Sequence, residues 1–100
     1  MANEGSERSI RGSITVSSGS GSLALTPVWL NARWVRIKPP SESATYDVTI
    51  SDADSILIVS RTGQVGTLSE QLSISLGIAK TIAIANSDAD GTFEVRLDPH

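Results

Sequence analysis

Apolar and polar residues alternate with period two through the last third of the chain. In residues 68–76 the apolar positions share one parity and serines and a glutamine take the other, and the alternation resumes in residues 78–85 and 93–97. Successive side chains of a β-strand point to opposite faces, so the pattern predicts three strands with one buried face each. Turn-forming residues at 86–91 separate the last two strands, and we predict a β-meander. The side chains expected on its buried face are Leu72, Ile74, Leu76, Ile82 and Ile84.

Further strand patterns precede this region. Residues 10–16 and 45–50 alternate in the same way, and residues 23–25 form a short apolar piece before Pro27. Residues 56–59 (ILIV) are apolar without alternation, which predicts a strand covered on both faces. The pattern as a whole predicts an all-β fold, an antiparallel β-sandwich that is jelly-roll-like or immunoglobulin-like, with about seven or eight strands.

A chain of 100 residues is expected to form one domain, which we place at residues 10–98. A sandwich of this size covers the inner face of its strands but has no further layer to cover their outer faces. A neighbouring subunit is therefore expected to cover the outer face of residues 56–59. This predicts a homo-oligomer, with a trimer favoured. Residues 1–9 are polar, carry both charges and lack periodicity. They are expected to form a flexible N-terminal arm, which either frays or becomes ordered on a neighbouring subunit.

Residues 29–38 contain both tryptophans. Trp34 and Arg36 share one face of the predicted strand, and Val35 and Ile37 share the other. The pattern leaves open which of the two faces is buried. Trp34 is therefore either a core or edge-covering residue, or an exposed contact for a partner.

Composition excludes several classes of partner. The formal net charge is −3, the isoelectric point is near 4.9, and the eight basic residues are scattered along the sequence. Because phosphate binding needs clustered Lys and Arg, we expect neither nucleic acid nor an anionic membrane as a partner. The chain has no cysteine and no apolar run of the length of a membrane helix. Residues 1–8 have no apolar core, so we expect no signal peptide there. Synthesis in the cytosol is expected.

Catalytic and metal sites are not indicated. The single histidine is His100, the last residue, and no serine lies in a Gly-x-Ser-x-Gly motif. Glu70 has the parity of the neighbouring leucines, so it lies either at a strand end or bulge, or beside an Arg or Lys at an interface. The Asp52/Asp54 and Asp88/Asp90 pairs are interpreted as turns, because a calcium loop needs further acidic ligands. We expect no enzyme activity, no cofactor and no metal.

Several stretches resemble small structural proteins of tailed-bacteriophage virions. They are residues 58–63 (IVSRTG), 66–70 (GTLSE), 76–78 (LGI) and the ending 87–97 (SDADGTFEVRL). The resemblance implies a β-sandwich protein that decorates or cements the head shell. Such proteins are similar to one another in being small, free of cysteine, non-enzymatic and commonly trimeric, and the family has no catalytic residues to carry over.

We therefore expect a virion structural protein that binds the major capsid protein at the outer surface of a bacteriophage head. The expected contacts are chosen by residue type, since Trp and Arg are enriched at binding hot spots. They are Asn3 and Arg8 in the arm, together with Trp29, Trp34 and Arg36. An alternative from another class is a β-sandwich module that binds carbohydrate or a cell surface through exposed aromatic residues.

Overall fold

The computed structural model describes residues 10–26, 31–54, 56–75, 77 and 79–99. Within these ranges the chain forms strands joined by turns, and no described residue lies in a helix. The strands are β1 (Ile10–Val16), β2 (Gly21–Leu25), β3 (Asn31–Lys38), β4 (Thr45–Asp52), β5 (Leu57–Val65), β6 (Leu68–Ser75), β7 (Lys80–Ala85) and β8 (Gly91–Asp98). The predicted all-β fold class is confirmed.

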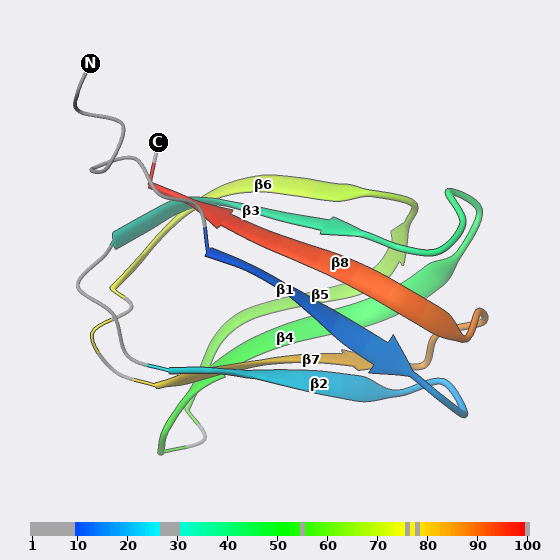
Figure 1. The fold of residues 1–100 in the computed structure, drawn as a ribbon, viewed down its shortest axis with the longest axis horizontal. Helices are drawn as coiled ribbons and strands as arrows, with labels where there is room; N and C mark the ends of the chain where they lie inside the picture. The colour runs from blue at the N-terminus through cyan, green and yellow to red at the C-terminus, as the bar shows by residue number, and fades with distance from the viewer. Residues whose placement is uncertain (1–9, 27–30, 55, 76, 78, 100) are drawn as a thin grey trace.

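The strands form two four-stranded antiparallel sheets that pack as the two layers of a sandwich (Figure 1). One sheet has the order β1-β8-β3-β6 and the other has the order β2-β7-β4-β5. The first strand lies beside the last, the second lies beside the seventh, and β1 and β2 belong to different sheets. This is the order of an eight-stranded jelly roll. An immunoglobulin-like fold would place the first two strands in one sheet.

The β-meander predicted for the last third of the chain is wrong, although its strands are present. β6 pairs with β3, β7 pairs with β2 and β4, and β8 pairs with β1 and β3. Each connection from β6 to β7 to β8 therefore crosses from one sheet to the other. A period-two pattern fixes which face of a strand is buried, but it does not specify the neighbouring strand.

Inward-facing side chains of both sheets form one core. Its largest members, Tyr46 and Phe93, are fully buried, and their rings meet edge to face with centroids 5.0 Å apart. Each fully buried aliphatic side chain around them stabilises the fold by ~1.5–3 kcal/mol. The best-buried aliphatic residues are Ile14, Val16, Val35, Ile37, Val48, Ile50, Ile82, Ile84, Val95 and Leu97.

The burial predicted for the last third is confirmed where the structure describes it. Ile74, Ile82 and Ile84 are 5%, 0% and 1% exposed. Leu76 and the side chain of Leu72 lie outside the described part of the chain.

The chain first crosses between the sheets after β1, where the backbones of β1 and β2 approach closely. A Cβ atom at Gly21 would lie 2.4 Å from the Thr15 carbonyl oxygen and 2.9 Å from a methyl group of Ile14. Backbone hydrogen bonds between Ser17 and Ser20 close the turn. Only glycine fits at position 21, because any side chain would force the two strands apart.

The connection from β5 to β6 also crosses between the sheets, and it contains Gly66, whose φ of +72° lies in the left-handed region. The Gly66 amide donates to the Ala44 carbonyl at 3.0 Å, and the Gly66 carbonyl accepts a hydrogen bond from the Tyr46 hydroxyl at 2.7 Å. Burial raises the pKa of Tyr46 to about 12. The buried hydroxyl is thus satisfied and attaches the crossing to the core.

β5 differs most from the sequence expectation. Ile56, Leu57 and Ile58 are 60%, 55% and 41% exposed. In the single chain these three residues are exposed, and the cover of residues 56–59 by a neighbouring subunit stays a prediction. β5 is the edge strand of its sheet, with β4 as its hydrogen-bonded neighbour, and the β4–β5 register shifts at two points. The predicted homo-oligomer stays a prediction.

Candidate binding surfaces

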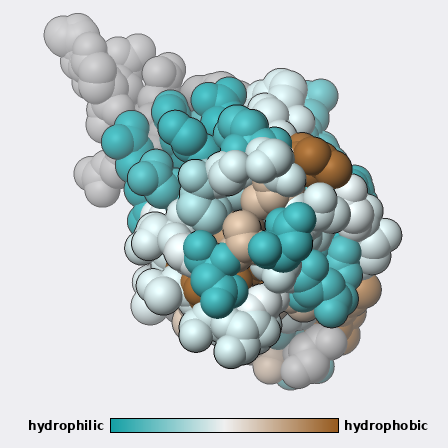
Figure 2. All heavy atoms as spheres, turned by 90° about the vertical axis from the view of Figure 1, so that its right-hand side faces the viewer, coloured by the Kyte–Doolittle hydropathy of each residue, from teal (hydrophilic) through white to brown (hydrophobic). Residues whose placement is uncertain are grey.

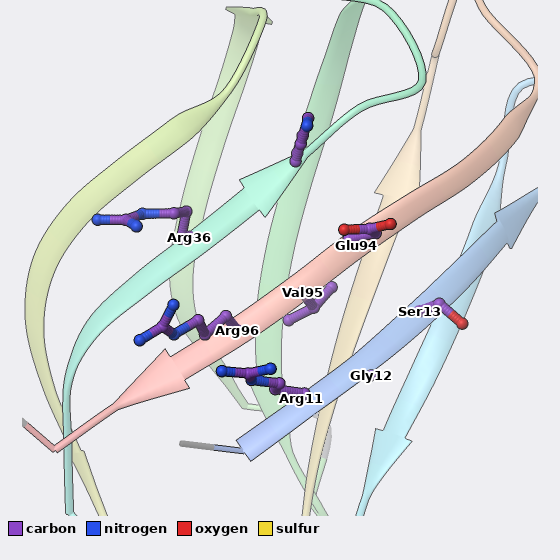
Figure 3. A pocket seen from close by; sticks show the side chains of 8 residues that line it. Arg11, Gly12, Ser13, Arg36, Glu94, Val95 and Arg96 are labelled. Atoms are coloured by element: carbon purple, nitrogen blue, oxygen red, sulfur yellow. The ribbon is translucent and has the colours of Figure 1, made fainter. Parts of the chain in front are cut away.

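The outer face of the β1-β8-β3-β6 sheet carries three arginines side by side. The strand register places Arg11 of β1 opposite Arg96 of β8, and Arg96 opposite Arg36 of β3. Figure 3 shows the three side chains on three neighbouring strands. Opposite side chains have Cβ atoms about 4.5–5.5 Å apart, and like charges in such positions repel each other. We call these three residues the arginine row.

The arginine row lines an open depression of about 540 Å³ on this face. Lys38 and Glu94, which lie opposite each other on β3 and β8, line the same depression. Asp98 accepts a hydrogen bond from Arg96 Nε at 2.9 Å. Among the residues that the structure describes, no ion pair involves the other two members of the row. The face as a whole is positively charged.

The fold thus gathers basic residues that are scattered in the sequence. The arginine row and Lys38 are four of the eight basic residues, although they come from both ends and the middle of the chain. The sequence shows that Arg36 and Lys38 share one face of β3, but not that this face is the outer one. The proximity of the four residues is not visible in the sequence, because it depends on β8 lying between β1 and β3.

Trp34 lies on the same outer face as Arg36. Trp34 is 37% exposed, whereas Val35 and Ile37 are 1% and 0% exposed. The face of β3 that carries Val35 and Ile37 is therefore the buried one, a choice that the sequence pattern left open. Trp34 is not a core residue. A register shift between Ala32 and Trp34 marks a bulge at this point of β3. Contact of Trp34 and Arg36 with a partner remains a prediction.

A second surface of interest is the exposed apolar part of β5. Ile56 directly precedes β5, Leu57 and Ile58 are its first two residues, and all three are exposed. Val65, the last residue of the strand, is 59% exposed. An edge strand also presents backbone N–H and C=O groups that its own sheet does not pair. Exposed apolar side chains on a free strand edge are typical of a protein–protein contact. We call residues 56–58 the exposed β5 segment.

Glu70 meets an arginine of its own chain. Arg61 Nε of β5 donates to Glu70 Oε1 of β6 at 2.7 Å, and Arg61 Nη2 contacts the other carboxylate oxygen. This bond raises the pKa of Arg61. The pair joins the edge strands of the two sheets. Because the side chains are 46% and 24% exposed, its contribution to stability is modest.

The first aspartate pair acts as a turn, as predicted. Asp52 Oδ1 accepts hydrogen bonds from the backbone amides of Asp54 at 2.9 Å and Ile56 at 3.0 Å. This is the local capping by which Asp stabilises a turn. The carboxylate therefore shapes the β4–β5 hairpin beside the exposed β5 segment.

The second aspartate pair ties turns together at the opposite end of the sandwich. Asp90 accepts hydrogen bonds from the amides of Ser18 and Gly19 at 3.2 and 3.1 Å. Asp88 accepts one from the Thr45 amide at 2.8 Å. Figure 2, which views the end at the right of Figure 1, shows a mainly hydrophilic or neutral surface with few hydrophobic side chains. The turn interpretation holds for this pair as well.

Two more carboxylates link loops and strands through hydrogen bonds. Glu42 accepts hydrogen bonds from the Thr67 amide at 2.9 Å and the Thr67 hydroxyl at 2.6 Å, which lower the pKa of Glu42. Asp47 accepts bonds from Asn86 and from the Gly63 amide, and these lower the pKa of Asp47. These are structural roles with identified donors.

The remaining predicted residues Asn3, Arg8 and Trp29, and His100, lie outside the described residues. In the part that is described, no group of three or more His, Cys, Asp or Glu side chains is placed to hold a metal ion. The described segments also contain no helix that is long and apolar enough to cross a membrane.

Comparison with known proteins gives weak similarities only. No protein-family model and no curated protein sequence matches the chain. Similar solved structures include an exo-β-1,3-galactanase from Phanerochaete chrysosporium with galactose, at 14% identity and a TM-score of 0.42. They also include the carbohydrate-binding module CBM36 in complex with calcium and xylotriose (13%, 0.37) and the VP2 subviral particle of infectious bursal disease virus (12%, 0.35).

The matches cover 89%, 86% and 93% of this chain, but 29%, 74% and 32% of the respective other chains. The chain therefore spans less than a third of the galactanase and VP2 chains. At such identities and TM-scores, the similarities transfer neither a function nor a binding site to this chain.

Proposed function

We propose that the chain is a non-enzymatic virion structural protein that associates with copies of itself and decorates and stabilises a bacteriophage head shell. The observation that carries the proposal is the exposed β5 segment. Three consecutive large apolar side chains, at the start of a strand that has a free edge, are 41–60% exposed. Such a surface is stabilised when a partner covers it.

A second copy of the chain is the proposed occupant of this segment. The exposed side chains are uncharged, so two copies meet there without opposing like charges. The nearby Arg61 and Glu70 already compensate each other within one chain. A symmetric neighbour would also add the apolar burial that a sandwich of 100 residues lacks. A trimer is the favoured state, by resemblance to virion decoration proteins.

The face that binds the shell is proposed to lie on the other sheet. Trp34 and Arg36 point outward there, and both residue types are common at the centre of tight interfaces. Residues 3–8 are proposed to add contacts as an arm. The major capsid protein is the proposed partner, and support for it comes from the sequence resemblance to virion proteins.

Self-association is tested by sedimentation of the full chain at micromolar concentration. The parent is expected to sediment as an oligomer, and Leu57→Ser is expected to shift it toward the monomer. Ala24→Ser is the matched control, because Ala24 is exposed on β2, the other edge strand of the same sheet. A monomeric parent, or equal loss in both variants, would contradict the proposed contact.

Decoration is tested by mixing the protein with undecorated phage heads and measuring bound protein and the temperature at which the heads break. The parent is expected to bind and to raise that temperature. Deletion of residues 2–9 and Trp34→Ala should each weaken binding, whereas Ala24→Ser should not. If the parent leaves heads bare or equally heat-sensitive, the decoration role is wrong. If both variants bind as the parent does, the proposed contact residues are wrong.

A further inference from the structure

The arginine row is unfavourable in the chain by itself. Three guanidinium groups face one another across neighbouring strands, and like charges directly opposite each other destabilise a sheet. Among the described residues, only Arg96 of the row forms an ion pair with a carboxylate, that of Asp98. An anionic ligand placed along the row would remove this repulsion and convert it into attraction.

We infer that this face binds a linear acidic polysaccharide that carries carboxylate or sulfate groups along its length. Guanidinium groups bind such planar or branched oxyanions through two parallel hydrogen bonds, which lysine cannot do. The row crosses three strands that lie about 4.7–4.9 Å apart, so it presents regularly spaced cations to a polymer. Lys38 adds a further cation in the same depression. The polysaccharide and the proposed head shell would compete for this face, because both proposals use Trp34 and Arg36.

The adjacent cross-strand positions supply surface for the sugar rings. Trp34 of β3 lies opposite Asp98 of β8 and Gln71 of β6 in the register. Trp34 is 37% exposed, and an indole face packs well against the C–H groups of a pyranose ring. The side chain of Gln71 is exposed and carries amide groups that bind hydroxyls. The face therefore combines anion-binding groups with an aromatic platform.

The open shape of the face and its side chains favour a polysaccharide over other ligands. Small-molecule sites bury most of their ligand, whereas this depression is open and the side chains of the row are exposed. An open face suits an internal stretch of a polymer. A single-stranded nucleic acid needs several aromatic side chains on which successive bases stack, and Trp34 is the one exposed aromatic residue among those that the structure describes. A peptide of acidic residues has no pyranose ring to pack against Trp34. Polyglutamate represents this class of ligand in the test.

The test is calorimetric titration of the full chain at physiological ionic strength. The probes are an alginate oligomer, which carries carboxylates, a heparin-derived oligomer, which carries sulfates, a neutral cello-oligosaccharide and polyglutamate. Saturable binding of at least one acidic oligosaccharide is expected, and the neutral sugar should not bind. Arg96→Gln and Trp34→Ala should each weaken binding about tenfold or more. Arg33→Gln is the matched control, since Arg33 is an exposed arginine of β3 outside the depression.

Thermal unfolding of the same proteins without ligand separates binding from structure. Arg11→Gln and Arg36→Gln are expected to keep or raise the unfolding midpoint, because each removes a repelling charge. If either substitution lowers the unfolding midpoint as much as a core substitution does, the arginine row stabilises the fold instead of binding a ligand. That result would overturn the inference. It is also overturned if no acidic oligosaccharide binds, if Arg33→Gln weakens binding as much as Arg96→Gln, or if polyglutamate binds as tightly as the sugars.

Discussion

Strands β8 and β5 are both rich in apolar residues, yet the apolar side chains of β8 are buried and most of those of β5 are exposed. β8 lies between β1 and β3, and its inward side chains Phe93, Val95 and Leu97 are at most 3% exposed. β5 lies at the edge of the other sheet, and large apolar side chains along it are 41–59% exposed. The amino-acid compositions of the two strands would predict similar burial for both.

Burial in this sandwich therefore follows the position of a strand in its sheet. A central strand that alternates strictly places one face on the core and the other toward solvent. A strand at the edge with consecutive apolar residues cannot place them all inward, because alternate side chains point outward. The apolar residues of β5 therefore remain available for a partner, whereas those of β8 are used by the chain itself.

The comparison is tested most directly by one substitution in each strand. Leu97→Ala should destabilise the chain by ~2–5 kcal/mol, because Leu97 is 1% exposed and its removal leaves a cavity. Leu57→Ala, at 55% exposure, should change the stability of the monomer by about 0.5 kcal/mol or less. Urea unfolding of dilute protein measures both values. Equal losses would show that β5 is packed as tightly as β8.

A smaller effect is expected where the core is attached to the turn after β5. Tyr46→Phe keeps the ring beside Phe93 but removes the hydrogen bond to the Gly66 carbonyl, and should cost ~1–2 kcal/mol. Tyr46 is the only tyrosine, so an ultraviolet titration reports it alone and should give a pKa of about 12. A tyrosine that titrates near its ordinary value of 10.0 would contradict the buried hydroxyl.

The ion pair at the β5 edge should contribute still less to the free energy of unfolding. Arg61→Ala removes the link to Glu70, and because Arg61 is 46% exposed the loss should be ~1 kcal/mol or less. The difference between parent and variant should shrink as salt is added, since salt screens exposed charges. Unfolding at low and high ionic strength tests this. A large loss that does not depend on salt would show that the edge is more buried than the structure has it.

The smallest effect concerns the pH dependence of the Glu42 contact. Hydrogen bonds from Thr67 hold the folded-state pKa of Glu42 below its ordinary value of 4.5. The stabilisation is therefore fully present above pH 4.5 and is lost as the pH falls through the folded-state pKa. Thr67→Val removes the hydroxyl donor and should move the pKa of Glu42 upward toward 4.5. Carboxyl NMR titration of both proteins measures the shift, and an unchanged pKa would contradict the contact.

Local alternation predicted most of the strands and, for β6 and β7, the face that is buried. Alternation predicted that Ile74, Ile82 and Ile84 are buried, and it placed Trp34 and Arg36 on one face. It also identified both Ser-Asp-Ala-Asp segments as turns. These features could be predicted because the direction of a side chain on a strand, and the capping of a turn by Asp, depend on the nearest few residues.

Which strands lie side by side is fixed by the three-dimensional fold and not by any local pattern. The fold replaced the predicted meander by the jelly-roll order, placed β5 at an edge where residues 56–58 are exposed, and gave Glu70 its partner Arg61. It also assembled the arginine row from positions 11, 36 and 96. Pairing between distant strands depends on how all the faces fit into one core, and no local pattern contains that information. Both proposed binding surfaces are products of this long-range order.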